Sequence, residues 1–189
     1  MGPKMNVMAN DAYPETTSIR ARIPMESGGR LVMAGFPGLE IGVDGSAYID
    51  AETLEATMSA MVSLGTKTLL VMAEEGELPD GAFGFLKTAA DRHAVRLEFM
   101  PIQDFSTPGD RFLEAWSSLG PQLHHRLAND EAVGLSCQYG AGRSGLVASL
   151  ILIEAGMTPV AAIRRVRSHF SQAVESKGQE DWLINLGQA

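Results

Sequence analysis

The single cysteine of the chain lies in a stretch whose residue types suit the chemistry of phosphate groups. The stretch reads SCQYGAGRSG at residues 136–145 and has five residues between Cys137 and Arg143. Gly140 and Gly142 allow a tight turn whose successive backbone N–H groups point inward and bind an anion. The planar guanidinium of Arg143 can hold two oxygens of a phosphate, and the same positive field favours a reactive thiolate. One loop can therefore activate a nucleophile and hold the group that it attacks.

Alternating strand and helix patterns put this loop at the edge of a sheet. The predicted strands cover residues 17–24, 29–38, 67–74, 96–102 and 131–137. The predicted helices cover 50–65, 79–94 and 109–130, the last interrupted at Gly120-Pro121, and three more begin near 143, at 158 and near 179. Such alternation is typical of an α/β fold, here a single domain with a central mixed, largely parallel sheet of four to five strands flanked by helices on both faces. The Cys-x5-Arg loop would connect the last strand to a buried helix, where open α/β sheets bind their ligands.

Composition and charge limit the class and the partners. A chain of 189 residues with 45% hydrophobic residues is long enough for one domain with a core, which we expect at 17–189 after a loose lead-in at 1–16. The net charge of −8 argues against nucleic acid and membrane surfaces as partners. The most apolar stretch, residues 146–156, is shorter than the ~20 residues of a membrane span, and the chain opens with no apolar run typical of a secretory signal. Because one cysteine forms no internal disulfide, we expect a cytoplasmic protein; its oligomeric state is not indicated.

Three patches of the sequence resemble one enzyme family. The stretch CQYGAGRSG at 137–145 is similar to the Cys-x5-Arg-Ser loop of the cysteine-dependent protein tyrosine phosphatases, and most like that of the small dual-specificity phosphatases. The stretch MPIQDFSTPGD at 100–110 resembles the loop that carries the general acid in that family, which implies that role for Asp104. The stretch ESKGQEDWL at 175–183 resembles the segment whose glutamine positions the hydrolytic water, which points to Gln179.

The resemblance implies a phosphatase that works through a phosphocysteine intermediate. Cys137 would attack phosphorus, Asp104 would protonate the leaving oxygen, and Ser144 would donate a hydrogen bond to the departing thiolate. The phosphate would be bound by the loop amides and the guanidinium, at Gln138, Tyr139, Gly140, Ala141, Gly142 and Arg143. No metal and no cofactor is expected, because positioning and fixed dipoles suffice for this phosphoryl transfer. The implied substrates are phosphorylated proteins or small phosphomonoesters, with phosphotyrosine first and phosphoserine or phosphothreonine beside it.

A second interpretation stays open because the family usually has a histidine immediately before the cysteine, where this chain has Ser136. Without that histidine the protein would be a weak enzyme or an inactive phosphate-binding module. Each residue also has a purely structural alternative. Cys137 would then be a core thiol, Asp104 a turn residue, and Ser144 and Gln179 would serve the starts of helices. A sulfurtransferase loop would not call for Asp104, and arsenate reduction would normally require further cysteines.

Overall fold

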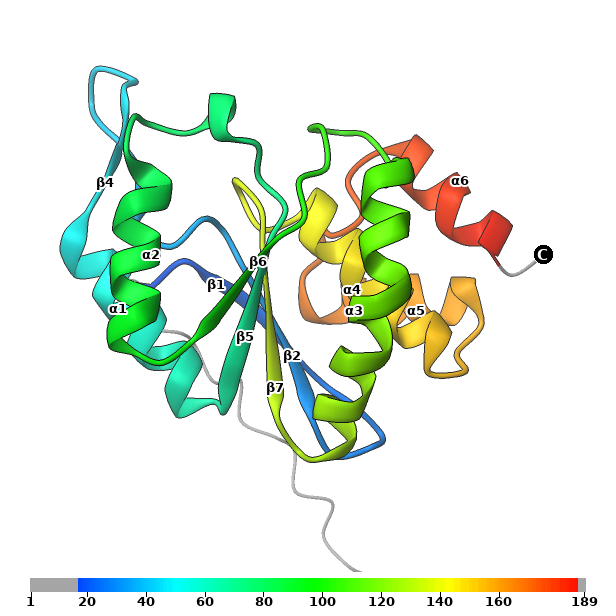
Figure 1. Ribbon diagram of the computed structural model, residues 1–189. Coiled ribbons are helices and arrows are strands. Elements are labelled where there is room, and N and C mark those ends of the chain that lie inside the picture. Colours follow the sequence, from blue (N-terminus) through cyan, green and yellow to red (C-terminus); the bar gives the residue numbers. More distant parts are fainter. Residues whose placement is uncertain (1–16, 187–189) are drawn as a thin grey trace, which may run out of the picture.

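A five-stranded sheet crosses the molecule with its strands in the order β1-β2-β7-β5-β6 (Figure 1). The computed structural model describes residues 17–186, and the lead-in predicted at 1–16 lies outside this range. The strands of this sheet are β1 (Ile19–Pro24), β2 (Arg30–Ala34), β5 (Thr66–Val71), β6 (Arg96–Phe99) and β7 (Ala132–Ser136). Only β1 runs antiparallel to its neighbour, so the predicted mixed, largely parallel sheet is confirmed.

Helices cover both faces of the sheet, as the alternating sequence pattern predicts (Figure 1). The helices α1 (Ala51–Ser63) and α2 (Ala82–Arg92) lie on one face. The other face carries α3 (Asp110–Ala128), α4 (Gly142–Glu154), α5 (Pro159–His169) and α6 (Lys177–Leu186). Successive side chains of β5 alternate between the two resulting cores, so that Leu69 and Val71 pack in the first and Leu70 in the second. The almost wholly buried α4 is the helix that the sequence predicts after the Cys-x5-Arg loop.

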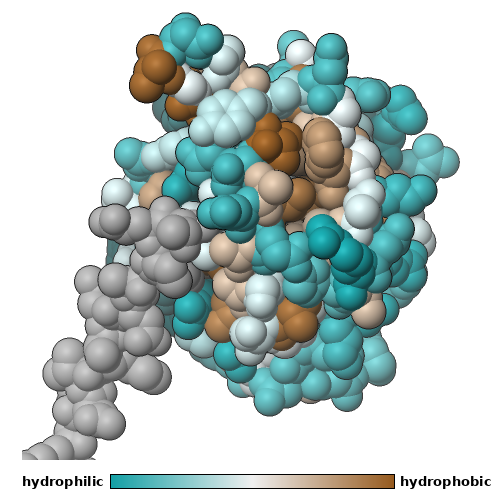
Figure 2. Space-filling model, turned by 90° about the vertical axis from the view of Figure 1, so that its left-hand side faces the viewer, coloured by the Kyte–Doolittle hydropathy of each residue, from teal (hydrophilic) through white to brown (hydrophobic). Residues whose placement is uncertain are grey.

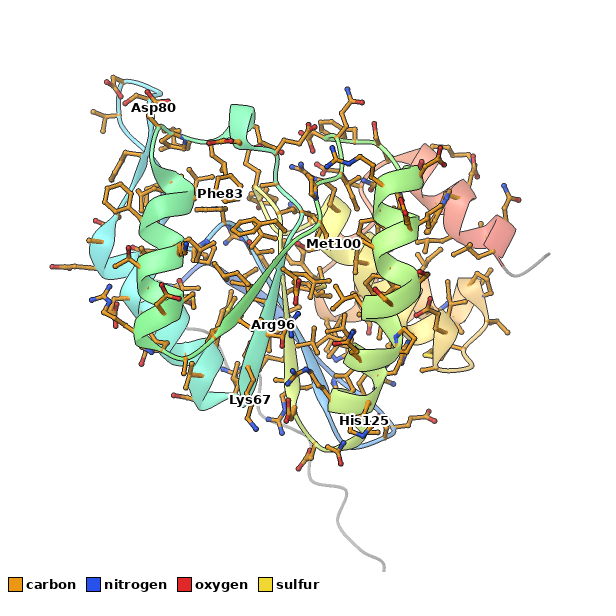
Figure 3. All side chains as sticks on the ribbon, viewed as in Figure 1. Lys67, Asp80, Phe83, Arg96, Met100 and His125 are labelled. Carbon is orange, nitrogen blue, oxygen red and sulfur yellow. The ribbon has the colours of Figure 1, made fainter. Side chains whose placement is uncertain are left out.

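The strand that leads into the Cys-x5-Arg loop, β7, lies in the centre of the sheet, and the loops that follow it and its neighbours gather at one edge. All five residues of β7 are buried because parallel strands cover both of its edges and helices cover both of its faces. The strands β2, β5 and β6 end earlier than predicted, at Ala34, Val71 and Phe99. The residues that follow β5, β6 and β7 form loops over the upper edge of the sheet in Figure 1. In Figure 3, Lys67 and Arg96 lie at the opposite edge, where β5 and β6 begin.

Three details differ from the sequence-based expectation. The helix α3 continues through Pro121 without interruption, because the proline lies on the exposed side, where water can bond the carbonyl of Ser117 that loses its partner. A hairpin of β3 (Leu39–Ile41) and β4 (Ala47–Ile49) forms in a segment for which the sequence analysis predicts no helix or strand. A single 3-10 turn, η1 (Glu75–Glu77), follows β5.

The face formed by α1, α2 and the hairpin carries apolar side chains at its surface, as Figure 2 shows. The exposed large hydrophobic residues of the two helices and of the hairpin with its turn are Ile41, Val43, Tyr48, Val62 and Phe85. Within residues 17–186, no helix is both long enough and apolar enough to cross a membrane.

Candidate active site

The Cys-x5-Arg loop begins at the end of the central strand and runs into the N-terminus of α4. The Cys137 thiol is 2% exposed, and the backbone N–H of Gly140 donates a hydrogen bond to its Sγ at 3.2 Å. Gly140 has a φ of +96°, and a Cβ built on it would lie 2.5 Å from the backbone of Gly35. Only glycine fits here, because the turn requires a left-handed backbone conformation and leaves no space for a Cβ beside the backbone at the end of β2.

The first turn of α4 supplies free donors beside this thiol. The helix begins at Gly142, and no side chain caps it at Ala141. The first N–H groups of a helix have no partner within the helix, and they carry the positive end of its dipole. Buried beside the cysteine, these groups form an anion-binding site of the kind that phosphate occupies.

Arg143 lies beneath the loop with its guanidinium held from several sides. Its side chain is 2% exposed, and its Nη1 and Nη2 donate to the two carboxylate oxygens of Glu77 at 2.5 and 2.7 Å. Nη1 also donates to the carbonyl of Ile102 at 3.0 Å, and Nη2 lies 3.2 Å from Oδ1 of Asp104. Burial alone would lower the pKa of Arg143, but the bonded Glu77 carboxylate, with Cys137 and Asp104 nearby, raises it above its ordinary value.

Glu77 is a site residue that the sequence-based prediction missed. It ends the turn η1, where its carboxylate also accepts the backbone N–H of Glu74. Its backbone carbonyl accepts a hydrogen bond from Nε2 of Gln138 at 3.0 Å, which joins η1 to the phosphate loop. The available signal was the acidic run EEGE at the carboxyl end of a predicted strand, which is the edge that carries the cysteine loop.

The way in which Glu77 binds Arg143 leaves one side of the guanidinium for a ligand. Glu77 takes the end-on pair of donors, one from Nη1 and one from Nη2. Among the described residues, no acceptor is bonded to Nε of Arg143, and the second Nη2 hydrogen faces only the half-exposed Asp104. Nε–H and this Nη2–H form the side-on fork that grips two oxygens of a phosphate.

Asp104 lies in the loop after β6, close to the cysteine loop as predicted. Its side chain is 45% exposed, and besides the contact with Arg143 its Oδ1 accepts the backbone N–H of Phe105 at 3.0 Å. Phe105 has a φ of +55°, a left-handed conformation that is unusual for a bulky residue. The sheet edge therefore brings Cys137, Arg143 and Asp104 together from two separate loops.

Two serines near Cys137, Ser136 and Ser144, donate hydrogen bonds from their hydroxyl groups to backbone carbonyls at the end of β2. Ser144 is wholly buried and donates to the carbonyl of Ala34 at 3.4 Å. The bond predicted from Ser144 to the departing Cys137 thiolate stays a prediction. Ser136, which replaces the histidine of the family pattern, is also wholly buried and donates to the carbonyl of Gly35 at 3.1 Å.

An aromatic ring with an arginine over it forms one rim of the site. Tyr139 is 50% exposed, and the guanidinium carbon of Arg20 lies 4.7 Å from the centre of its ring. Nε of Arg20 donates to the carbonyl of Tyr139 at 3.0 Å, and the ring of Phe170 lies 6.3 Å away. Arg20 thus holds both the backbone and the ring of a phosphate-loop residue, and no local pattern in the sequence indicated it.

Gln179 lies beside the phosphate loop and is wholly buried. Its Oε1 accepts the backbone N–H groups of Glu175 and Ser176, and its Nε2 donates to the carbonyl of Ser106 in the acid loop. The role predicted for Gln179, which is to position water, stays a prediction. In the part of the chain that the structure describes, no group of three or more histidine, cysteine, aspartate or glutamate side chains could hold a metal ion.

Comparisons with known proteins agree with this geometry. No protein-family model matches the chain. Among curated proteins, it is 31% identical over 93 residues to protein tyrosine phosphatase type IVA 3 of Mus musculus and 26% identical over 91 residues to probable protein tyrosine phosphatase type IVA A of Dictyostelium discoideum. Each match covers 48% of this chain, and the chain spans about half the length of these relatives, 52% and 54%.

Solved structures extend the likeness over the whole domain. A kinase associated phosphatase whose catalytic cysteine is replaced by serine superposes with a TM-score of 0.72 at 20% identity, over 90% of this chain and 93% of that one. Tk-PTP in its active form gives a TM-score of 0.62 at 22% identity, over 90% and 97%. The chain therefore has the fold of the cysteine-based protein tyrosine phosphatases, and the resemblance to their small dual-specificity type that its sequence predicted is confirmed.

Proposed function

We propose that this protein hydrolyses phosphomonoesters through a phosphocysteine intermediate. One observation carries the proposal: a buried thiol with a backbone donor at 3.2 Å lies in the same loop as a buried arginine whose Nη2 lies 3.2 Å from Asp104. Nucleophile, anion clamp and proton donor are the three parts that such a reaction requires. The phosphatase names of the relatives support the same reaction class.

In the first step, the thiolate of Cys137 attacks phosphorus in line with the leaving oxygen. The S–P bond forms while the P–O bond breaks, and protonated Asp104 transfers its proton to the leaving oxygen. The side-on fork of Arg143 and the loop amides hold the remaining phosphate oxygens as charge moves onto them. Glu77 fixes the plane of the guanidinium, so that the fork is already oriented when the phosphate arrives.

In the second step, the carboxylate of Asp104 takes a proton from a water molecule whose oxygen attacks phosphorus. The S–P bond breaks, inorganic phosphate leaves, and the thiolate of Cys137 is restored. The donor available to this thiolate is the backbone N–H of Gly140. A second donor from Ser144 would require its hydroxyl to turn away from Ala34.

Phosphotyrosine is the substrate that we propose first, with phosphoserine and phosphothreonine beside it. The phosphate-loop interior QYGAG carries no lysine or further arginine, which disfavours substrates with additional phosphate groups. The half-exposed ring of Tyr139 at the rim offers an apolar surface to an aromatic substrate. The single cysteine must stay a free thiol, which is consistent with the reducing cytoplasm.

The alternative function is a phosphate-binding module without turnover. Its specific basis is Ser136, which replaces the histidine of the family pattern. The experiment that separates the two is turnover of para-nitrophenyl phosphate by the purified chain beside Cys137→Ser, with vanadate binding measured on both. An active enzyme loses turnover in Cys137→Ser and still binds the oxyanion, because the loop amides and Arg143 remain. A parent protein that binds vanadate and releases no nitrophenol is the inactive module, and that result overturns the proposal.

A further inference from the structure

The segment that begins α6 contains a capping box, a pair of side chains that close the open end of a helix reciprocally. Ser176 and Gln179 have the S-x-x-Q spacing of this motif. The hydroxyl of Ser176 accepts the backbone N–H of Gln179 at 3.1 Å, and Oε1 of Gln179 accepts the backbone N–H of Ser176 at 3.3 Å. The acceptor atoms of both side chains are therefore used inside the helix start.

Both side chains also have donors, and both donors go to the loop that carries Asp104. The hydroxyl of Ser176 donates to the carbonyl of Phe105 at 2.9 Å. Nε2 of Gln179 donates to the carbonyl of Ser106 at 3.2 Å. Two consecutive carbonyl groups of the acid loop are thus bonded to two side chains more than 70 residues further along the chain.

The acid loop needs such support, because few other contacts hold its part around Phe105 and Ser106. Phe105 combines a left-handed φ of +55° with a side chain that is 57% exposed, so packing does not compensate its backbone strain. The inner half is held on the other side, where Nη1 of Arg143 donates to the carbonyl of Ile102. Asp104 lies between these two attachments, and its carboxylate reaches Arg143 while they hold.

We infer that Ser176 and Gln179 are positioning residues for the general acid, because their capping box docks the acid loop where Asp104 faces the phosphate loop. The inference rests on the proposed function and assigns Gln179 a task distinct from positioning water. It predicts that weakening the box affects the proton transfer to the leaving group before it affects the other steps. A good leaving group needs no proton, so its hydrolysis is the internal reference.

The test is Ser176→Ala, with kcat/KM measured on phenyl phosphate and on an activated aryl phosphate of low leaving-group pKa. Loss of one hydrogen bond to the loop should reduce the phenyl phosphate rate by about fivefold and leave the activated substrate nearly unchanged. Ser176→Thr keeps donor and acceptor and should restore the parent rates. Thr158→Ala is the matched control, since the hydroxyl of Thr158 caps α5 by accepting the backbone N–H of Ala161 and has no other hydrogen bond within residues 17–186.

A second comparison identifies the residue through which the box acts. In an Asp104→Asn background the phenyl phosphate rate should not fall further on Ser176→Ala, because the group that the box positions is already disabled. Amide hydrogen exchange over residues 103–107 should be faster in Ser176→Ala than in Thr158→Ala, a readout that needs no catalysis.

The outcomes separate this inference from the proposed function. A parent protein without turnover refutes the proposed function, and exchange rates in the acid loop that are equal in Ser176→Ala and Thr158→Ala refute the docking role by themselves. With an active parent, an equal loss of Ser176→Ala on both substrates would assign the box to general stability and overturn the inference. A further loss in the Asp104→Asn background would do the same.

Discussion

Glu77→Gln tests how the site keeps a buried arginine in place. The change removes the negative charge opposite Arg143 and turns one of two acceptors into a donor that faces the guanidinium N–H groups. The Arg143 side chain is 2% exposed and Glu77 is 17% exposed, so little water replaces the lost interaction. Truncation of one partner of a buried ion pair costs about 3–5 kcal/mol. Because Arg143 keeps its bond to Ile102 and its contact with Asp104, we expect the free energy of unfolding to fall by about 3 kcal/mol, the lower end of that range.

The effect on catalysis should divide unequally between the kinetic constants. A guanidinium that is free to turn presents its side-on fork less often, so kcat should fall by about 10- to 100-fold. KM should stay level or fall, because the change removes a negative charge that repels the phosphate of the substrate. The assay combines urea unfolding with para-nitrophenyl phosphate kinetics. Vanadate should raise the melting temperature of Glu77→Gln more than that of the parent, since the bound anion replaces the missing counter-charge.

Glu75→Gln is the matched control for this variant. It removes the same charge from the same turn, but Glu75 is exposed and its carboxylate has no ion pair among the described residues. The reasoning would be refuted by a Glu77→Gln protein whose unfolding free energy and kcat match those of Glu75→Gln. It would equally be refuted by a rise in KM with kcat unchanged, which would mean that Glu77 serves substrate binding alone.

Three further predictions concern the loop, the arginine and a remote carboxylate. Arg143→Lys should lower kcat/KM by at least ~10²-fold, because a point charge cannot replace the fork; a loss below tenfold would remove Arg143 from the mechanism. Gly140→Ala should cost about 3 kcal/mol or more in urea unfolding, since its Cβ would lie 2.5 Å from the backbone after β2; unfolding at the parent midpoint would contradict the close approach. Burial raises the pKa of Glu154, but hydrogen bonds from His124 and Trp116 outweigh it and hold the pKa below 4.5. The stability that Glu154 contributes is thus present above pH 4.5 and lost as the pH falls through its folded-state pKa, so Glu154→Gln should be less stable than the parent at neutral pH and the difference should shrink as the pH falls below 4.5; a pH-independent difference would refute this.

Local patterns were sufficient to predict the strands of the main sheet, the helices α1 to α6 and the Cys-x5-Arg loop. The Cys-x5-Arg loop could be assigned from its strand, its glycines and the apolar helix after it, because these signals are contiguous in the sequence. Asp104 was singled out only through the family resemblance of its loop, and the structure places its carboxylate 3.2 Å from Nη2 of Arg143. The sequence pattern likewise predicted the two-sided cover of the sheet.

What the sequence could not supply are contacts that depend on the exact position of distant segments. The Glu77–Arg143 pair joins residues 66 positions apart, and nothing in the EEGE run distinguishes the glutamate that turns inward. The hydroxyl of Ser144 bonds a strand 110 residues away, so its partner depended on how closely β2 passes the loop. The interruption predicted at Pro121 was wrong, because propensity could not show that the proline lies on the exposed side of α3.

The central claim is that Cys137 carries the phosphoryl group during turnover. Asp104→Ala with an activated aryl phosphate should make that species accumulate, because the first step needs no proton for this leaving group while the second step loses its base. The measurement is mass spectrometry of the acid-quenched protein. The account predicts one added phosphoryl group on the peptide that contains Cys137, and none in the double variant with Cys137→Ser. Release of the aryl alcohol at a steady rate with no phosphoryl group on Cys137, or with the group on another residue, would contradict it.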